Sequence, residues 1–316
     1  MQLVSCLLQP TKKIWMDGKF VSWKDAKVHF LTHALHYGSG VFEGIRAYKA
    51  VSGKYAIFRL KDHVKRMFHS AKTLEMAMPY NEHEIYNAII KTVRVNEKSC
   101  GGADSIYIRP LVYYGYGKLG LDPTGAELNI GIACWPWGAY LGEKAQKSGI
   151  SATSSFLKRM YSTPEIAHAK ITGHYSNSIL AKHDAHRKGY DEAIMYDLHG
   201  KIAEGTGENI FIVKSGKLVT PPAGSILLGI TRDTLIKIAR DFKIPVLVKF
   251  FGKRQLYNAD EAFLCGTAAE ITPIRETDDK IIGKSCPGRI TELLRELYLD
   301  IVHGKIAKYE NWLDYV

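Results

Sequence analysis

The stretch Lys201–Val213 places two carboxylates and one amide in a short turn between apolar residues. It reads Lys-Ile-Ala-Glu-Gly-Thr-Gly-Glu-Asn-Ile-Phe-Ile-Val, so the polar groups are Glu204, Glu208 and Asn209. Glycines on both sides of the threonine allow the backbone to approach a ligand closely. Carboxylates in such surroundings are costly unless each one is paired. The pattern fits either a polar hairpin loop or a carboxylate placed to face a cationic ring nitrogen.

Three other features suit an anionic ligand. Residues Leu228–Asp233 open an amphipathic helix, where backbone N–H groups and a threonine hydroxyl converge. Residues Gly266–Ala269 break a strand with small side chains and expose further N–H donors, and Arg66 adds a guanidinium in the helix after Phe58. Each feature alone is more often structural. Together with Glu204 they indicate a phosphorylated cofactor that carries a cationic nitrogen.

Pyridoxal 5'-phosphate fits that description, and its chemistry requires a lysine. Composition does not single out this lysine among the 43 lysine and arginine residues. Lys170 follows the loop 162–169 and directly precedes a glycine-bearing helix start, away from the solvated runs of charge. Position therefore makes Lys170 the candidate.

Size and composition exclude several classes of protein. The 316 residues, 46% of them hydrophobic, suffice for about two domains. Because no apolar run reaches the length of a membrane span and no signal peptide is recognisable, we expect a protein without a membrane partner. The five scattered cysteines fit the reducing cytoplasm and argue against a disulfide frame or a zinc site. The net charge of +11 is spread along the chain, which favours anionic metabolites over nucleic acid.

The order of predicted elements indicates an α+β fold. Asp17-Gly18 predicts a hairpin within Ile14–Val21, because this dipeptide favours a tight turn between strands. Hairpins followed by helices predict a small α+β domain over 1–135, a linker over 136–148 and a larger domain over 149–316. The other expected strands are 45–48, 55–58, 105–114, 127–135, 191–196, 201–203, a strand that begins at Ile210, 246–251, 262–265 and 271–275. The expected helices are 60–74, 81–95, 175–188, 231–241 and 288–302.

Several motifs invite other interpretations. Gly115–Gly120 matches a dinucleotide fingerprint, but the turn that begins at Leu121 follows it instead of the helix that a nicotinamide oxidoreductase needs. His33 and His36 have no acidic or cysteine partner at ligand spacing, so we expect no metal. Ser39 lies between glycines, and its flanks predict a turn and not a nucleophile.

Six segments, in order, resemble the branched-chain amino acid aminotransferases, which are fold type IV pyridoxal-phosphate enzymes, along nearly the whole chain. Any one segment alone would be unspecific. The segments are Ala34–Arg46, Tyr107–Pro110, Pro136–Gly142, Glu204–Asn209, Gly229–Asp233 and Gly266–Pro273.

The resemblance implies a small α+β domain, a larger pseudo-barrel domain and a cofactor between them. It makes Lys170 the Schiff-base lysine and proton shuttle, with Glu204 facing the pyridine nitrogen and Tyr175 the ring hydroxyl oxygen. A carboxylate at this nitrogen favours its protonated form, and a freed lysine acts as general base. The implied cofactor-binding residues are Arg66, Lys170, Tyr175, Glu204, Gly207, Asn209, Leu227, Gly229, Ile230, Thr231, Gly266 and Thr267.

The resemblance also implies a pocket that accepts apolar side chains and glutamate. Arg109 would face the distal carboxylate of glutamate, with Tyr107 and the Thr267-Ala268 turn near the α-carboxylate. Tyr37 and Leu121 would come from a second subunit of a homodimer or homohexamer. The implied substrate-binding residues are Tyr37, Phe42, Gly44, Tyr107, Arg109, Leu121, Trp137, Tyr140, Thr267 and Ala268.

The expected reaction is amino transfer between leucine, isoleucine or valine and 2-oxoglutarate by a ping-pong mechanism. Two features depart from the family: Ile171-Thr-Gly-His-Tyr175 replaces a small-residue run with Asn before Tyr, and Leu228 replaces a frequent Pro. A D-amino acid aminotransferase or an aminodeoxychorismate lyase of the same fold is the nearest alternative. The segments Tyr107–Arg109 and Tyr37–Arg46 favour the branched-chain prediction.

Overall fold

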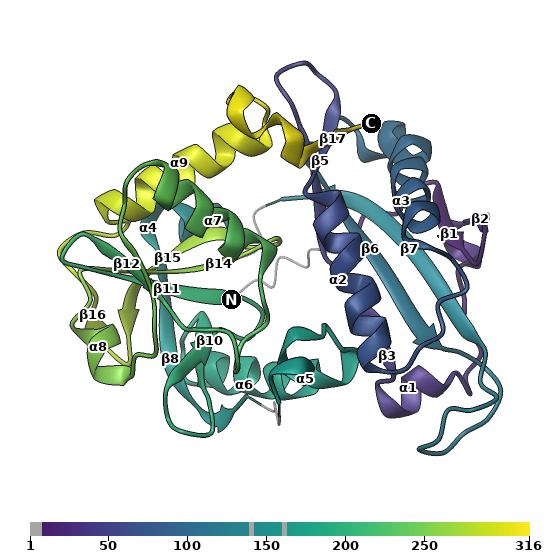
Figure 1. Cartoon of the computed structure of the whole chain (residues 1–316), viewed down its shortest axis with the longest axis horizontal. Helices are drawn as coiled ribbons and strands as arrows, with labels where there is room; N and C mark the ends of the chain where they lie inside the picture. Colours follow the sequence, from purple (N-terminus) through teal and green to yellow (C-terminus); the bar gives the residue numbers. More distant parts are fainter. Residues whose placement is uncertain (1–7, 139–141, 160–162) are drawn as a thin grey trace. The chain divides into compact units, whose positions relative to one another are not determined.

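The computed structural model describes residues 8–138, 142–159 and 163–316. The chain divides into two compact units (Figure 1). Unit 1 comprises residues 1–138 and 302–316, and unit 2 comprises residues 139–301. In the described ranges, none of the helices combines the length and apolar character needed to cross a membrane.

Unit 1 is built on one sheet with two long helices along one face (Figure 1). The strand order is β17-β5-β4-β6-β7-β1-β2, and β3 also pairs with β6. The strands are β1 (Lys13–Met16), β2 (Lys19–Ser22), β3 (Gly40–Phe42), β4 (Ile45–Lys49), β5 (Tyr55–Phe58), β6 (Ser105–Tyr114), β7 (Leu128–Trp137) and β17 (Leu313–Tyr315). The helices are η1 (Trp23–Asp25), α1 (His33–Tyr37), α2 (Leu60–Thr73), α3 (Glu82–Asn96), η2 (Glu97–Cys100) and η4 (Ala307–Trp312).

Local sequence signals account for much of unit 1. Asp17 and Gly18 have φ values of 47° and 89°, the left-handed turn that the expected hairpin between β1 and β2 requires. Helix α3 begins at a capping box in which the Asn81 side chain accepts from Glu84 N and Glu84 accepts from Asn81 N. Its buried face packs on the sheet, and this confirms the helix expected over 81–95.

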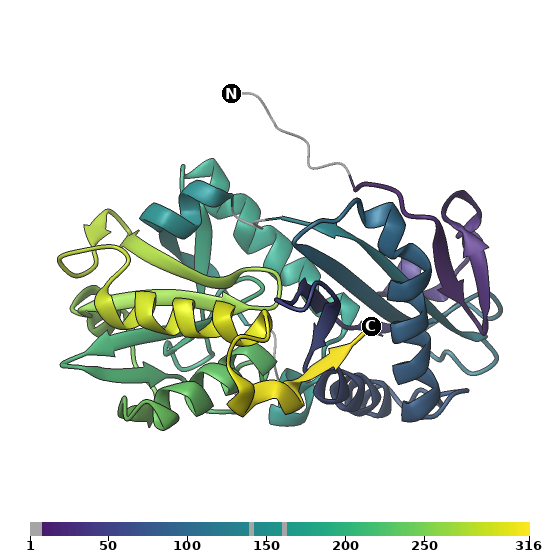
Figure 2. The same ribbon diagram turned by 90° about the horizontal axis from the view of Figure 1, so that it is seen from above.

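The C-terminal strand differs from the expected domain boundary. The second domain was expected to run to residue 316, whereas β17 pairs with β5 of unit 1, with Leu313 opposite Phe58 and Tyr315 opposite Ala56 (Figure 2). A three-residue strand carries too little periodicity to reveal its partner. Its backbone groups are satisfied at the open edge of β5, which places residues 302–316 in unit 1.

Unit 2 is organised around a sheet of order β10-β9-β8-β15-β14-β11-β12-β13, with β16 on β15. Its strands are β8 (Ile150–Lys158), β9 (Glu192–Tyr196), β10 (Ile202–Glu204), β11 (Asn209–Lys214), β12 (Lys217–Thr220), β13 (Val246–Val248), β14 (Glu261–Gly266), β15 (Glu270–Thr277) and β16 (Lys280–Ile281). Its helices are α4 (Glu143–Ser148), α5 (Pro164–His168), η3 (Thr172–His174), α6 (Tyr175–Arg187), α7 (Ile230–Asp241), α8 (Lys253–Tyr257) and α9 (Arg289–Val302).

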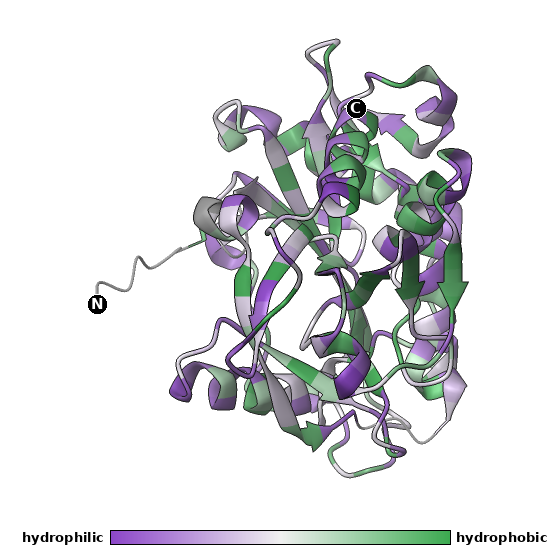
Figure 3. Ribbon diagram, turned by 90° about the vertical axis from the view of Figure 1, so that its left-hand side faces the viewer, coloured by the Kyte–Doolittle hydropathy of each residue, from purple (hydrophilic) through white to green (hydrophobic). Residues whose placement is uncertain are grey.

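Strand β8 lies inside this sheet, between β9 and β15, and was not expected from the sequence. It runs parallel to both β9 and β15. Its serine- and threonine-rich run lacks a clear apolar alternation, although Ile150 and Ala152 are fully buried in the core of the unit. Hydrophobic positions lie along the strands and on one side of the helices, as the colouring of Figure 3 shows.

Candidate active site

Lys170 and Tyr175 lie on a short connection between two helices of unit 2. Lys170 follows α5, the single turn η3 comes next, and Tyr175 opens α6. The Lys170 Nζ donates to the Tyr175 hydroxyl oxygen over 2.7 Å. Both side chains are half-buried, so the amine and the phenol that meet here are partly exposed to solvent.

Glu204 ends strand β10 and is only 4% exposed. Its Oε2 accepts from the Asn209 Nδ2 at 3.1 Å and from the Leu227 backbone N at 3.1 Å. The Asn209 Nδ2 also donates to the Leu227 carbonyl oxygen at 2.9 Å. Burial raises the pKa of Glu204, and the charge of Arg159 is the strongest influence in the opposite direction. Glu204 is therefore a buried, fixed carboxylate and not part of a solvated loop.

Arg159 was not predicted as a site residue. Its NH2 lies 2.7 Å from the Glu204 Oε1, and both side chains are buried. In the sequence, Lys158-Arg159 is one of several short basic clusters. Arg159 directly follows the run Ile150–Lys158, which the sequence did not reveal as a strand. Without strand β8, nothing in the sequence showed that the Arg159 side chain faces Glu204.

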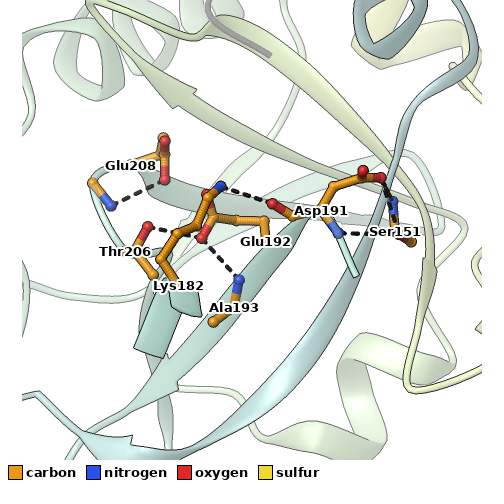
Figure 4. A network of polar contacts seen from close by, with 8 residues as sticks. Ser151, Lys182, Asp191, Glu192, Ala193, Thr206 and Glu208 are labelled. Atoms are coloured by element: carbon orange, nitrogen blue, oxygen red, sulfur yellow. Dashed lines mark hydrogen bonds and ion pairs between the residues drawn. The ribbon is translucent and has the colours of Figure 1, made fainter. Parts of the chain in front are cut away.

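Glu208 lies beside a second group of polar contacts, which is centred on Glu192 (Figure 4). The Thr206 hydroxyl donates to the Glu192 Oε1 at 2.7 Å, and the Lys182 Nζ lies 2.5 Å from the Glu192 Oε2. The Glu208 Oε2 accepts from the Gly207 N at 3.0 Å. Burial, together with the nearby charge of Glu192, raises the pKa of Glu208 to about 8. Of the two turn carboxylates, Glu208 thus supports the turn, and Glu204 is the one paired with Arg159.

The two expected anion-binding features lie next to this turn. Strand pairing sets Asn209 opposite Cys265, the residue before Gly266. Gly229 precedes the first turn of α7, and a Cβ placed on it would lie 2.0 Å from the Asn209 Oδ1. Asn209 thus connects the turn, the start of α7 and the end of β14. Helix starts and tight turns of this kind direct N–H groups at anions.

Thr231 and Thr267 supply hydroxyls at these two features. Ile230 and Thr231 form the first turn of α7 and are buried. Gly266, Thr267 and Ala268 lie at the turn between β14 and β15 and are half-buried. Of the unit 2 residues predicted to bind the cofactor, direct contacts join Glu204, Asn209, Leu227 and Gly229, and Gly266 lies beside Gly207.

Arg66, in unit 1, is fixed by a buried carboxylate. Its Nε and NH2 donate to the two oxygens of Glu43 at 2.7 and 2.8 Å, and His63 Nδ1 contacts the Glu43 Oε2 at 2.7 Å. Glu43 is completely buried. Burial alone would raise the pKa of Glu43, but Arg66 and His63 outweigh burial and lower it. The guanidinium of Arg66 is thus held in one orientation.

The expected substrate residues of unit 1 form an aromatic and cationic group. The Arg109 NH2 donates to the Tyr107 hydroxyl oxygen at 3.1 Å, and the guanidinium lies 4.7 Å from the centre of the Phe42 ring. The rings of Tyr107 and Trp137 are 4.6 Å apart. A Cβ on Gly44 would lie 2.1 Å from the Tyr107 hydroxyl, so the glycine gives this tyrosine its room.

Tyr37 and Leu121 are exposed on unit 1, by 44% and 89% respectively. Tyr140 lies outside the described residues. The described residues include no group of three or more His, Cys, Asp or Glu side chains suited to a metal. A donor set of amine, phenol and buried carboxylate, with a helix start and a small-residue turn beside it, fits pyridoxal 5'-phosphate, which needs contacts to its aldehyde, hydroxyl, ring nitrogen and phosphate.

Comparisons with known proteins agree with this chemistry. The sequence profile of the family described as Amino-transferase class IV matches residues 40–277. The branched-chain-amino-acid aminotransferase of Pseudomonas aeruginosa is 45% identical over 299 residues, which cover 95% of each chain.

Two solved structures are similar in fold as well as in sequence. The branched-chain aminotransferase of Thermoproteus uzoniensis with norvaline superposes with a TM-score of 0.89 at 44% identity, over 96% of this chain and 99% of that one. The T.th. branched-chain amino acid aminotransferase complexed with N-(5'-phosphopyridoxyl)-L-glutamate gives 0.87 at 41% identity, over 96% and 98%.

The fold and the site together define a pyridoxal-phosphate enzyme of fold type IV, and the chain belongs to the class IV aminotransferase family. Within this family it belongs with the branched-chain amino acid aminotransferases, so its activity is amino transfer and its cofactor is pyridoxal 5'-phosphate.

Proposed function

We propose that this enzyme moves the amino group of leucine, isoleucine or valine to 2-oxoglutarate by a ping-pong mechanism. The observation that carries the proposal is the pair of contacts in unit 2 that joins Lys170 to Tyr175 and Glu204 to Arg159. The relatives support the choice of substrates, because one solved relative is bound to norvaline and another to a phosphopyridoxyl adduct of L-glutamate.

Lys170 moves the proton between the carbon atoms that exchange the amino group. When bound, pyridoxal 5'-phosphate withdraws electrons from the substrate Cα, which makes its proton removable. The Lys170 amine takes that proton, and the Tyr175 hydroxyl at 2.7 Å positions the Nζ. Glu204 stabilises positive charge at the ring nitrogen, since an anion favours the protonated form of a nearby base.

The remaining cofactor contacts are part of the same proposal, and the local geometry supports them. N–H groups and hydroxyls at the start of α7 and at the β14–β15 turn would hold the phosphate, and the guanidinium of Arg66, which Glu43 orients, is proposed as a further contact. The residues proposed to hold the cofactor are Arg66, Lys170, Tyr175, Glu204, Gly207, Asn209, Leu227, Gly229, Ile230, Thr231, Gly266 and Thr267.

Substrate selection requires a pocket that takes both an apolar side chain and a carboxylate. Arg109 is proposed to pair with the distal carboxylate of glutamate, and Phe42 and Trp137 to line the apolar wall. The α-carboxylate is assigned to Tyr107 and the Thr267-Ala268 turn, and Gly44 keeps the space for Tyr107.

A second copy of the chain is proposed to complete the pocket with Tyr37 and Leu121. Their exposure supports this, because large apolar side chains that protrude from a monomer mark contact surfaces. Tyr140 is proposed as a further wall residue. We propose a homodimer or homohexamer, and sedimentation of the purified protein distinguishes the two.

The two half-reactions test the proposal separately. Holoenzyme mixed with leucine alone is expected to release the matching 2-oxo acid in an amount equal to the enzyme, and later addition of 2-oxoglutarate to release glutamate and restore the starting spectrum. Release of the 2-oxo acid only when both substrates are present would contradict the ping-pong order. Turnover of D-alanine but not L-leucine would favour the D-amino acid aminotransferase alternative.

A further inference from the structure

Arg159 contributes a permanent positive charge to the site. Its backbone N donates to the Tyr196 carbonyl oxygen at 2.9 Å, which fixes the residue just after β8. Its side chain is 6% exposed, and its NH2 lies 2.7 Å from the Glu204 Oε1. A guanidinium stays charged at every pH at which a protein folds, so Glu204 always faces a cation.

The other arm of this guanidinium reaches helix α6. The Arg159 NH1 donates to the Ser178 hydroxyl at 2.8 Å and contacts the Met195 Sδ at 3.7 Å. Ser178 lies three residues after Tyr175, which is nearly one helical turn. One side chain therefore links Glu204 to the helix whose first residue meets Lys170.

The charge state of Glu204 depends on this arrangement. Burial favours the neutral carboxyl and raises its pKa, and Arg159 opposes this more than the Leu227 N–H or Lys170 does. A buried carboxylate that loses its cation takes up a proton and does not remain charged. A neutral carboxyl no longer stabilises a cationic ring nitrogen.

We propose that Arg159 is a positioning residue that keeps Glu204 ionised and aimed at the cofactor ring nitrogen, and that ties this carboxylate to the helix that carries Tyr175. The proposal rests on the function proposed above. It means that the pair of Arg159 and Glu204, and not Glu204 alone, keeps the ring nitrogen protonated and so lets the cofactor withdraw electrons. Arg159 itself acts through Glu204 and touches no reacting atom.

The test follows the protonation of the ring nitrogen directly. Pyridoxal 5'-phosphate labelled with ¹⁵N in the ring is bound to wild type, Arg159→Gln and Arg159→Lys, and its ¹⁵N resonance is followed with pH. Wild type is expected to keep the protonated form over the whole range. In Arg159→Gln the nitrogen is expected to lose its proton within this range, at a pH at least about one unit below that of wild type. Arg159→Lys retains the charge and is expected to stay close to wild type.

Arg59→Gln is the matched control. Arg59 is buried to the same degree as Arg159, but its Nε donates to the Asp62 Oδ2 and it belongs to unit 1. Its loss is expected to lower stability and to leave the ¹⁵N titration unchanged. An identical titration in Arg159→Gln and wild type would overturn the proposal, as would an equal shift in the control.

A second measurement needs no Arg159 variant and no cofactor. In the apoprotein, the infrared difference between wild type and Glu204→Gln at neutral pH is expected to contain the carboxylate stretch of Glu204. A neutral carboxyl band in its place would refute the role of Arg159. If instead wild type binds no cofactor through a lysine while this carboxylate band is present, the proposed function fails and the Arg159–Glu204 pairing stands.

Discussion

Glu208→Gln is predicted to change how the stability of the apoprotein depends on pH. In the folded protein, burial and the charge of Glu192 raise the pKa of Glu208 from an ordinary 4.5 to about 8. The unfolded chain gives up this proton near 4.5, whereas the folded chain keeps it to about 8. The contribution of protonated Glu208 to the free energy of unfolding is therefore fully present below pH 4.5 and declines as the pH rises towards 8.

The size of the effect follows from proton linkage. Between these two pKa values the unfolding free energy falls by about 1.4 kcal/mol per pH unit, because the folded state binds one more proton than the unfolded state. From pH 5 to pH 8 this amounts to roughly 4 kcal/mol. Glutamine cannot ionise, so the variant is expected to lack this decline and to gain stability over wild type as the pH rises.

Urea unfolding of wild type and variant at a series of pH values measures this difference. Glu127→Gln removes an exposed carboxylate and serves as the control, which is expected to follow wild type. Parallel pH profiles of Glu208→Gln and wild type would refute the reasoning. They would mean that Glu208 is ionised in the folded state and that the network in Figure 4 carries its full charge.

Two further substitutions test the phosphate side of the site. Glu43→Gln removes the charge that orients Arg66, so the affinity for the cofactor is expected to fall about tenfold. Fluorescence titration of the apoprotein measures this affinity. An unchanged affinity would mean that cofactor binding does not depend on the orientation of Arg66 by Glu43. Gly229→Ala would place a Cβ 2.0 Å from the Asn209 Oδ1, and we expect a loss of about 1–3 kcal/mol in urea unfolding of the apoprotein together with weaker cofactor binding. Unfolding at the wild-type urea concentration would contradict the close contact.

Elements with strong local periodicity were predicted well. The strand expected over 105–114 is β6 with the same bounds, and the helix expected over 231–241 begins one residue earlier as α7. These elements follow from regular apolar spacing and from turn residues, which act within the segment itself. Strands β8 and β17 were not predicted, because each is defined by partners distant in sequence.

The site was predicted in the same uneven way. Among the predicted residues of unit 2, Asn209 connects Glu204 with Gly229 at the start of α7. The role of Arg159 was missed because a buried ion pair between residues 45 positions apart leaves no local pattern. Similarly, nothing in the turn sequence distinguishes Glu204 from Glu208. The structure separates them, because Glu204 is buried beside Arg159 and Glu208 is buried near Glu192.

The central claim is that the cofactor is tethered at residue 170. Holoprotein reduced with borohydride and digested with a protease is expected to yield one phosphopyridoxyl-modified peptide, which contains Lys170. Lys170→Ala, treated in the same way, is expected to yield none. A modified peptide that contains a different lysine in the wild-type protein would contradict the account.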